Sequence, residues 1–212
     1  MRAVRLHAAG EPLRIEDVPT PEPTGTEVRI RVAACGVCHT DLHIVDGTQS
    51  RVQLPVTLGH EVAGWIDAVG PDAEVLLKRH RLEAGSPVVA FGGWGCGECR
   101  DCTAGEEQRC AFSRAPGFQV DGGYAEFMLV PHPRHLARLR RLDPVQAAPL
   151  ADAGVTPYRA VRRAEPWLTE AARVLLIGCG ALGQFALQYL RLVPPAGRDL
   201  FVAVRELSPA RL

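Results

Sequence analysis

The sequence has no excess of charge of either sign and no long apolar run. Lysine plus arginine and aspartate plus glutamate each total 24 of the 212 residues, so the bulk charge favours neither nucleic acid nor an acidic membrane as a partner. No segment approaches the roughly 18 consecutive apolar residues that a membrane span requires. Residues 1–13 also lack the apolar stretch of a signal peptide. We therefore expect a cytoplasmic protein.

Cysteine, in contrast, is plentiful. The chain has 7 cysteines, and four of them fall between Cys96 and Cys110. In a reducing compartment, clustered cysteines are more often metal ligands or catalytic groups than disulfides.

The first part of the chain reads as short strands interrupted by glycine and proline. Alternating or continuous apolar patterns predict strands, and they occur at 2–8, 27–35, 61–70, 86–92 and 123–131. The pattern predicts a mostly-β domain over residues 1–150.

The pattern changes near residue 144. A helical stretch interrupted by prolines is followed by a short buried strand at 173–178, a helix at 181–193 and a second buried strand at 199–206. Strand, glycine turn, helix and strand form a βαβ unit, which requires a parallel sheet. We expect residues 151–212 to begin an α/β domain whose two strands cannot bury both their faces.

The four clustered cysteines are Cys96, Cys99, Cys102 and Cys110, spaced C-x2-C-x2-C-x7-C. Four thiolates on tight turns provide the tetrahedral donor set that zinc prefers. Because all four positions come from protein, the pattern predicts a structural zinc without an open position. Unligated cysteines or two disulfides are the alternatives, and a DNA-binding zinc finger does not fit the spacing.

A second set of possible ligands is more dispersed. A catalytic zinc needs three protein ligands and one open position. Cys38 in the segment 34–43, His60 in the segment 58–64 and an acid later in the chain would satisfy this requirement.

A glycine turn links the strand and helix of the βαβ unit. Gly178, Gly180 and Gly183 form G-x-G-x-x-G between them, the context in which this motif binds a dinucleotide. The three glycines would allow the tight turn, the approach of the pyrophosphate and close helix packing, respectively. The phosphates would meet the amides near Ala181 and Leu182.

Glu206 at the end of the second strand is a candidate for binding the ribose. An acid at this position accepts hydrogen bonds from the ribose hydroxyls and repels a 2′-phosphate, which favours NAD over NADP. Arg205 beside it keeps NADP open as the alternative.

Five motifs follow one another in the chain: GVCHTD (36–41), GHEVAG (59–64), the four-cysteine segment, LADAGVTPY (150–158) and GCGALG (178–183). In order and approximate distance they resemble the medium-chain zinc-dependent alcohol dehydrogenases over the whole chain. The resemblance implies a GroES-like β domain followed by a Rossmann domain. It also implies zinc- and NAD-dependent oxidation of an alcohol to an aldehyde or ketone, with two zinc ions per chain.

The resemblance assigns the catalytic metal site residue by residue. Cys38 and His60 match the first two ligands of the catalytic zinc, and Asp152 matches the third. Glu61 matches an acid that approaches the zinc when water exchanges. Asp41 matches the carboxylate that orients the ligating histidine.

Proton transfer and cofactor contacts are assigned in the same way. Zinc would lower the pKa of the alcohol, Thr40 would accept its proton, and His43 would pass the proton to solvent. His39 matches a position near the pyrophosphate and Thr156 one near the nicotinamide. Arg211 matches a basic position near the adenosine ribose.

The chain departs from the family in three places. Residues 194–199 are slightly long for the connection between the helix and the second strand. Residues 71–87 are longer and more basic than the corresponding turn, which indicates an insertion or a reading-frame error. Members of the family also continue well beyond residue 212, so we expect a C-terminally truncated chain with little or no turnover, and a homodimer or homotetramer for the full-length form.

A non-catalytic zinc-binding fragment, or an enzyme acting on a polyol, sugar or aromatic alcohol, remains the alternative. Trp94 and the region around Leu54 are candidates for lining the substrate pocket.

Overall fold

The computed structural model describes residues 1–193 and 200–208. The chain divides into two compact units, Met1–Ala151 and Asp152–Leu212. In the part of the chain that the structure describes, no helix combines the length and the apolar character needed to cross a membrane.

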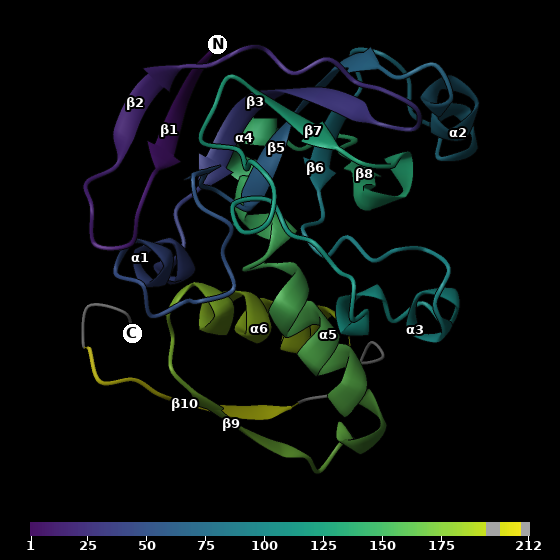
Figure 1. Cartoon of the computed structure of the whole chain (residues 1–212). Helices are drawn as coiled ribbons and strands as arrows, with labels where there is room; N and C mark the ends of the chain where they lie inside the picture. The colour runs from purple at the N-terminus through teal and green to yellow at the C-terminus, as the bar shows by residue number, and fades with distance from the viewer. Residues whose placement is uncertain (194–199, 209–212) are drawn as a thin grey trace. The chain divides into compact units, whose positions relative to one another are not determined.

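The first unit is built on a five-stranded antiparallel sheet in the order β7-β3-β5-β6-β8 (Figure 1). Its strands are β3 (Val28–Gly36), β5 (Glu61–Val69), β6 (Pro87–Ala90), β7 (Phe127–Val130) and β8 (Leu136–Arg138). A smaller antiparallel sheet, β2-β1-β4, comprises β1 (Arg2–Leu6), β2 (Arg14–Asp17) and β4 (Val56–Thr57).

Successive side chains of each strand point to opposite faces of the main sheet, and one face is apolar and buried. In β3, Val28 and Ile30 are fully buried, whereas Arg29 lies over the ring of Phe127 on the other face. The buried residues of β3, β5, β6 and β7 form one core, so each strand contributes one apolar face, as period-two patterning requires.

Short helices and turns of 3-10 helix connect these strands. They are α1 (His39–Val45), α2 (Ala73–Arg79), α3 (Arg100–Thr103), η1 (Glu107–Arg109), η2 (Pro133–His135), α4 (Pro144–Ala147) and η3 (Ala148–Ala151). Ile44 of α1 packs with Leu6, Val56 and Leu58 in a separate small core.

The segment 71–87 is an integral part of the first unit. It forms α2 and the turn that leads into β6, and Ala73, Leu77 and Leu82 are buried in the main core. A regular helix with a buried face is therefore present where the sequence only suggests an unusual insertion.

One sequence expectation about a strand needs correction, and one helix was not predicted. The strand predicted at 123–131 is limited to β7, because the amides of Gly122 and Gly123 donate to the carbonyls of Thr57 and Gly59 instead of a sheet ladder. The prediction also overlooks the helix α1, which begins inside the cysteine- and histidine-containing segment.

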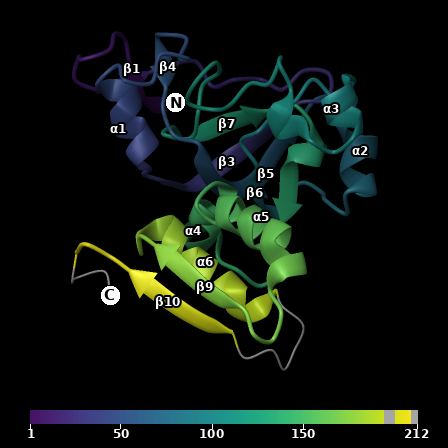
Figure 2. The ribbon, with the colours of Figure 1, turned by 90° about the horizontal axis from the view of Figure 1, so that it is seen from below.

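The second unit contains α5 (Val155–Ala164), η4 (Glu165–Trp167), β9 (Arg173–Ile177), α6 (Ala181–Leu192) and β10 (Phe201–Arg205). β9 and β10 pair in parallel, with Val174 opposite Val202. Both of these valines pack with Val161 of α5 and Leu190 of α6, and the two helices lie on one side of the strands (Figures 1 and 2).

The opposite face of β9 and β10 is exposed, as the sequence predicts for a sheet of only two strands. Leu175, Ile177 and Phe201 are 61%, 78% and 59% exposed. Among the described residues, helices cover one face of this pair of strands, so the residues that alternate onto the other face meet solvent.

Candidate functional site

The four clustered cysteines converge on one point. Their sulfur atoms all lie within 4.8 Å of one another, with 3.9 Å between Cys96 and Cys102 and 3.8 Å between Cys99 and Cys110. Zinc–sulfur bonds of about 2.3 Å in a tetrahedron separate the sulfurs by about 3.8 Å. The spacing therefore fits a zinc ion and is far longer than the roughly 2 Å bond of a disulfide.

The electrostatics of this cluster also favour a bound cation. Backbone N–H groups of Glu98 and Cys99 donate to Cys96 and lower the pKa of its thiol to about 7. Burial, together with the neighbouring cysteines, raises the pKa of Cys102 to about 12. A cation bound at the centre of the cluster would stabilise all four thiolates.

A carboxylate and a guanidinium attach this lobe to the rest of the first unit. Glu107 accepts from Arg134 at 3.1 Å and from the Gly95 amide at 3.1 Å. Arg134 also donates to the Gly95 carbonyl at 2.9 Å. Sequence reasoning missed this pair, because 27 residues separate Glu107 from Arg134 and neither belongs to a ligand motif.

Cys38 begins helix α1. Its sulfur accepts from the Thr40 amide at 3.5 Å, and its own amide donates to the Asp41 carboxylate at 2.9 Å, which together form a capping box. The sulfur is therefore fixed at the N-terminus of a helix.

His60 is held by the same carboxylate. Its Nδ1 lies 3.6 Å from Asp41 Oδ1, and both side chains are buried. Because Nδ1 faces the carboxylate, Nε2 is the nitrogen available to a metal. Burial opposes ionisation of Asp41, but hydrogen bonding with His60 and the Cys38 amide holds its pKa below the usual value.

Tyr124 completes this arrangement and was not predicted from the sequence. Its hydroxyl donates to Asp41 Oδ2 at 2.9 Å. Burial and this hydrogen bond raise the pKa of Tyr124 well above its usual value, so the hydroxyl remains a donor. Only the position of Tyr124 in the tertiary structure reveals its role, since 83 residues separate it from Asp41.

Asp152 is joined by one peptide bond to Ala151, which is buried in the first unit. The possible ligand atoms of Cys38, His60 and Asp152 lie within 4.8 Å of one another. A thiolate, an imidazole and a carboxylate are the ligand types of a catalytic zinc with one open position. The donor set therefore fits a second zinc.

The remaining candidates of this region lie on α1 and β5. Thr40 Oγ1 is 3.5 Å from Cys38 Sγ, and the side chain of His43 is 46% exposed. The ring of His39 stands edge-on to that of His43, 4.8 Å away. Glu61 is buried against Gly36, where any side chain would collide with its carboxylate.

The glycine turn of the second unit has the backbone of a dinucleotide-binding loop. Gly178 has a φ of +91°, and a side chain on Gly183 would lie 2.2 Å from the Gly178 carbonyl. Around Gly180 there is open space. Ala181 and Leu182 form the first turn of α6.

Two further residues predicted to contact the cofactor lie in the second unit. Glu206 accepts from the amides of Cys179, Leu207 and Ser208 at 2.6, 2.8 and 3.0 Å. The Thr156 hydroxyl donates to Asp152 at 3.2 Å. Arg211 lies outside the described residues.

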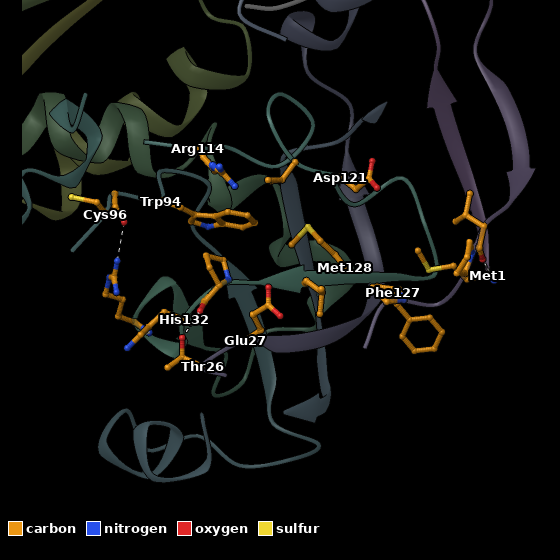
Figure 3. Close-up of a pocket in the computed structure, with 18 of the residues that line it drawn as sticks. Met1, Thr26, Glu27, Trp94, Cys96, Arg114, Asp121, Phe127, Met128 and His132 are labelled. Atoms are coloured by element: carbon orange, nitrogen blue, oxygen red, sulfur yellow. Dashed lines mark hydrogen bonds between the residues drawn. The ribbon is translucent and has the colours of Figure 1, made fainter. Parts of the chain in front are cut away.

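Trp94, a candidate for lining the substrate pocket, is buried. It is 5% exposed, its indole N–H donates to the Phe91 carbonyl, and it lines an open hollow of about 850 Å³ together with Phe127 and Met128 (Figure 3). Neither Cys38 nor His60 is among the residues that line this hollow.

The geometry agrees with what comparison with known proteins shows. Residues 24–141, more than half of the chain, match the alcohol dehydrogenase GroES-like domain. The prediction of a GroES-like domain is therefore confirmed.

Several characterised relatives extend over almost the whole chain. An NAD-dependent alcohol dehydrogenase of Sulfurisphaera tokodaii is 44% identical over 206 residues, which are 92% of this chain and 57% of the relative. D-arabinose 1-dehydrogenase (NADP(+)) of Saccharolobus solfataricus is 42% identical over 90% of this chain and 54% of its own.

A solved structure shows the same similarity in three dimensions. The alcohol dehydrogenase of Aeropyrum pernix superimposes with a TM-score of 0.87 at 40% identity, covering 100% of this chain and 61% of that chain. The chain thus spans a little under three fifths of the length of the relatives it matches. The domain match, the identity and the two sets of metal ligands together show that the chain belongs to the medium-chain zinc alcohol dehydrogenase family.

Proposed function

We propose that the protein interconverts an alcohol and its aldehyde or ketone by hydride exchange with NAD. The observation that carries this proposal is the group formed by Cys38, His60 and Asp152, with the Asp41 carboxylate behind the histidine. A purely structural zinc needs four protein ligands. Three leave a position for the oxygen of a substrate.

Zinc held by these ligands would act as a Lewis acid toward that oxygen. Asp41 would hold the His60 ring in the orientation that presents Nε2, and Tyr124 would hold Asp41. Thr40 would accept the proton of the alcohol, because its hydroxyl lies beside the sulfur of Cys38. His43, half exposed, would pass that proton to solvent. Glu61 would serve as the acid close to the metal when water exchanges.

We propose that the second unit begins a Rossmann domain, with the two units corresponding to the predicted catalytic and NAD-binding domains. The turn from Gly178 to Gly183 supplies open space and amides for a pyrophosphate. Glu206 would exchange its hydrogen bond to the Cys179 amide for the ribose hydroxyls. His39, Thr156 and Arg211 remain proposed cofactor contacts.

The alternative cofactor is NADP. Arg205 adjoins Glu206 and could accept a 2′-phosphate, and one relative is described as an NADP(+) enzyme. The affinities of NAD and NADP, measured for the protein and for Glu206→Gln, distinguish the two. A preference for NAD that disappears in the variant supports the assignment.

The alternative substrate is a sugar or another polyol, and the same relative, described as a D-arabinose dehydrogenase, favours it. A panel of primary, secondary and aromatic alcohols, polyols and aldoses separates these classes. We further propose that the whole protein is a cytoplasmic homodimer or homotetramer.

Metal occupancy and coordination provide the first test. We expect two zinc ions per chain, one at each group of ligands, and the loss of one in Cys38→Ser. Cobalt bound in place of the zinc at Cys38 should change its visible absorption when an alcohol is added, whereas cobalt in the four-cysteine site should not.

For the whole protein, we expect alcohol-dependent formation of NADH. Two zinc ions without any reaction on the panel would support a non-catalytic zinc-binding protein instead.

A further inference from the structure

A cluster of cations surrounds a hollow at one edge of the main sheet of the first unit. The hollow has a volume of about 720 Å³ and is lined by His80, Arg81, Pro87, Arg138, Leu139 and Arg140. Four of these six side chains carry or can acquire positive charge, and the described residues that line the hollow include no carboxylate.

Two elements present these cations. His80 and Arg81 follow the last turn of α2, the helix formed by the unusual segment 71–87. Arg138 and Arg140 lie on either side of Leu139 at the end of the edge strand β8. Leu139 is buried in the core, and its two arginine neighbours are exposed to solvent.

The backbone at Arg81 ends α2 and contacts Arg138. Its φ is +58°, the only described residue other than glycine in the left-handed region. Its carbonyl accepts a hydrogen bond from Arg138 Nη1 at 3.0 Å. This bond joins the two elements across the hollow and uses one of the five N–H donors of Arg138. The left-handed conformation ends α2 in a Schellman motif, in which the amides of Arg81 and Leu82 donate to the carbonyls of Lys78 and Leu77.

Two acids lie near the cluster but do not line its hollow. Glu74 and Glu83 line the adjoining hollow, which Arg81 and Arg138 also border, and Glu74 pairs with Lys78 at 3.4 Å. The cations that face the hollow therefore repel one another unless an anion is bound.

We propose that this hollow, defined by His80, Arg81, Arg138 and Arg140, is a binding site for an oligophosphate anion. Guanidinium groups bind phosphate oxygens through paired N–H donors, and three of them around one hollow match a ligand with several adjacent phosphates. No Phe, Tyr or Trp is among the described lining residues, so the site offers no platform for stacking bases. This chemistry favours a small oligophosphate over a nucleic acid.

The test is calorimetric titration of the zinc-loaded protein with inorganic tripolyphosphate in a buffer of low ionic strength. We expect saturable binding, and about tenfold weaker binding in Arg140→Gln, the loss typical of one charge-assisted hydrogen bond or more. Arg14→Gln is the matched control, because it removes the same charge from an exposed arginine of the first unit that pairs with Glu11. Its affinity should stay within about twofold of the parent protein.

A second variant separates binding from folding. Arg81→Gly removes a cation at a position where glycine relieves the backbone strain, so we expect weaker binding without lower thermal stability. Absence of saturable binding to the parent protein, or equal losses in Arg140→Gln and Arg14→Gln, would overturn the proposal. The same titration is repeated with orthophosphate and with a short DNA duplex. Tight binding of DNA that persists without tripolyphosphate binding would also overturn it.

Discussion

The Nδ1 atom of His60 lies 3.6 Å from Oδ1 of Asp41, and the two side chains are 8% and 5% exposed. The same carboxylate accepts the Cys38 amide and the Tyr124 hydroxyl. One buried acid therefore supports two of the three proposed catalytic ligands.

The first prediction concerns this acid. Asp41→Asn keeps the shape of the side chain but removes its charge, and we expect it to weaken zinc binding at the Cys38–His60 site by about 10- to 100-fold. Competition with a metal chelator measures the change. Asp46→Asn, an exposed change at the other end of α1, is the control. Equal zinc affinity in Asp41→Asn and the parent protein would exclude the supporting role.

The second prediction concerns the four-cysteine lobe. Cys102→Ser should remove one zinc ion per chain and lower the free energy of unfolding by at least about 2 kcal/mol, since metal binding there contributes to folding. Cys179→Ser changes a buried cysteine outside both groups and should leave the zinc content unaltered. If both variants keep the full zinc content, the lobe does not bind the metal.

The third prediction concerns Gly59, which precedes His60. Its φ is +95°, and an added Cβ would lie 2.6 Å from Cys35 Sγ and 2.6 Å from Tyr124 Cδ1. Gly59→Ala should cost about 2–4 kcal/mol from strain and overpacking together. Gly10→Ala meets a similar φ of +81° in open space and should cost only about 1 kcal/mol. Urea denaturation measures both, and similar losses would mean that the contacts around Gly59 relax.

The fourth prediction concerns the pH dependence of stability. Burial lowers the pKa of His135 to about 3, whereas in the unfolded chain it titrates near 6.5. The unfolded state therefore binds more protons between these values, so the stabilisation is complete above about pH 6.5 and is lost as pH falls toward 3.

Between pH 7 and pH 5, His135 should account for a loss of about 2 kcal/mol. We expect the pH dependence of unfolding to be flatter by this amount in His135→Gln, with zinc present throughout. An unchanged slope in His135→Gln would show that His135 is not the group responsible.

The metal ligands could be predicted, because those of one site are close together in the sequence and those of the other occur in motifs typical of the family. Cys96 to Cys110 occupy one loop, so spacing alone predicts that they meet. The turn from Gly178 to Gly183 is equally local, and its backbone follows from the lack of side chains.

Contacts between distant segments could not be anticipated. Tyr124 reaches Asp41 and Arg134 reaches Glu107 only after the sheet has formed. Helix α1 was missed because seven residues are too few to show a helical period, and its start depends on a cysteine cap. The buried face of α2 could not be recognised from the sequence, because basic residues in its last turn interrupt the apolar pattern.

Because Cys38 caps α1, metal binding at its sulfur should change the first turn of this helix. The sulfur that accepts the Thr40 amide is also a proposed zinc ligand. A metal that fixes the sulfur would order the first turn and slow the exchange of the Thr40 amide proton with solvent. The exchange rate of this one amide proton therefore reads out the state of the site without substrate, cofactor or turnover.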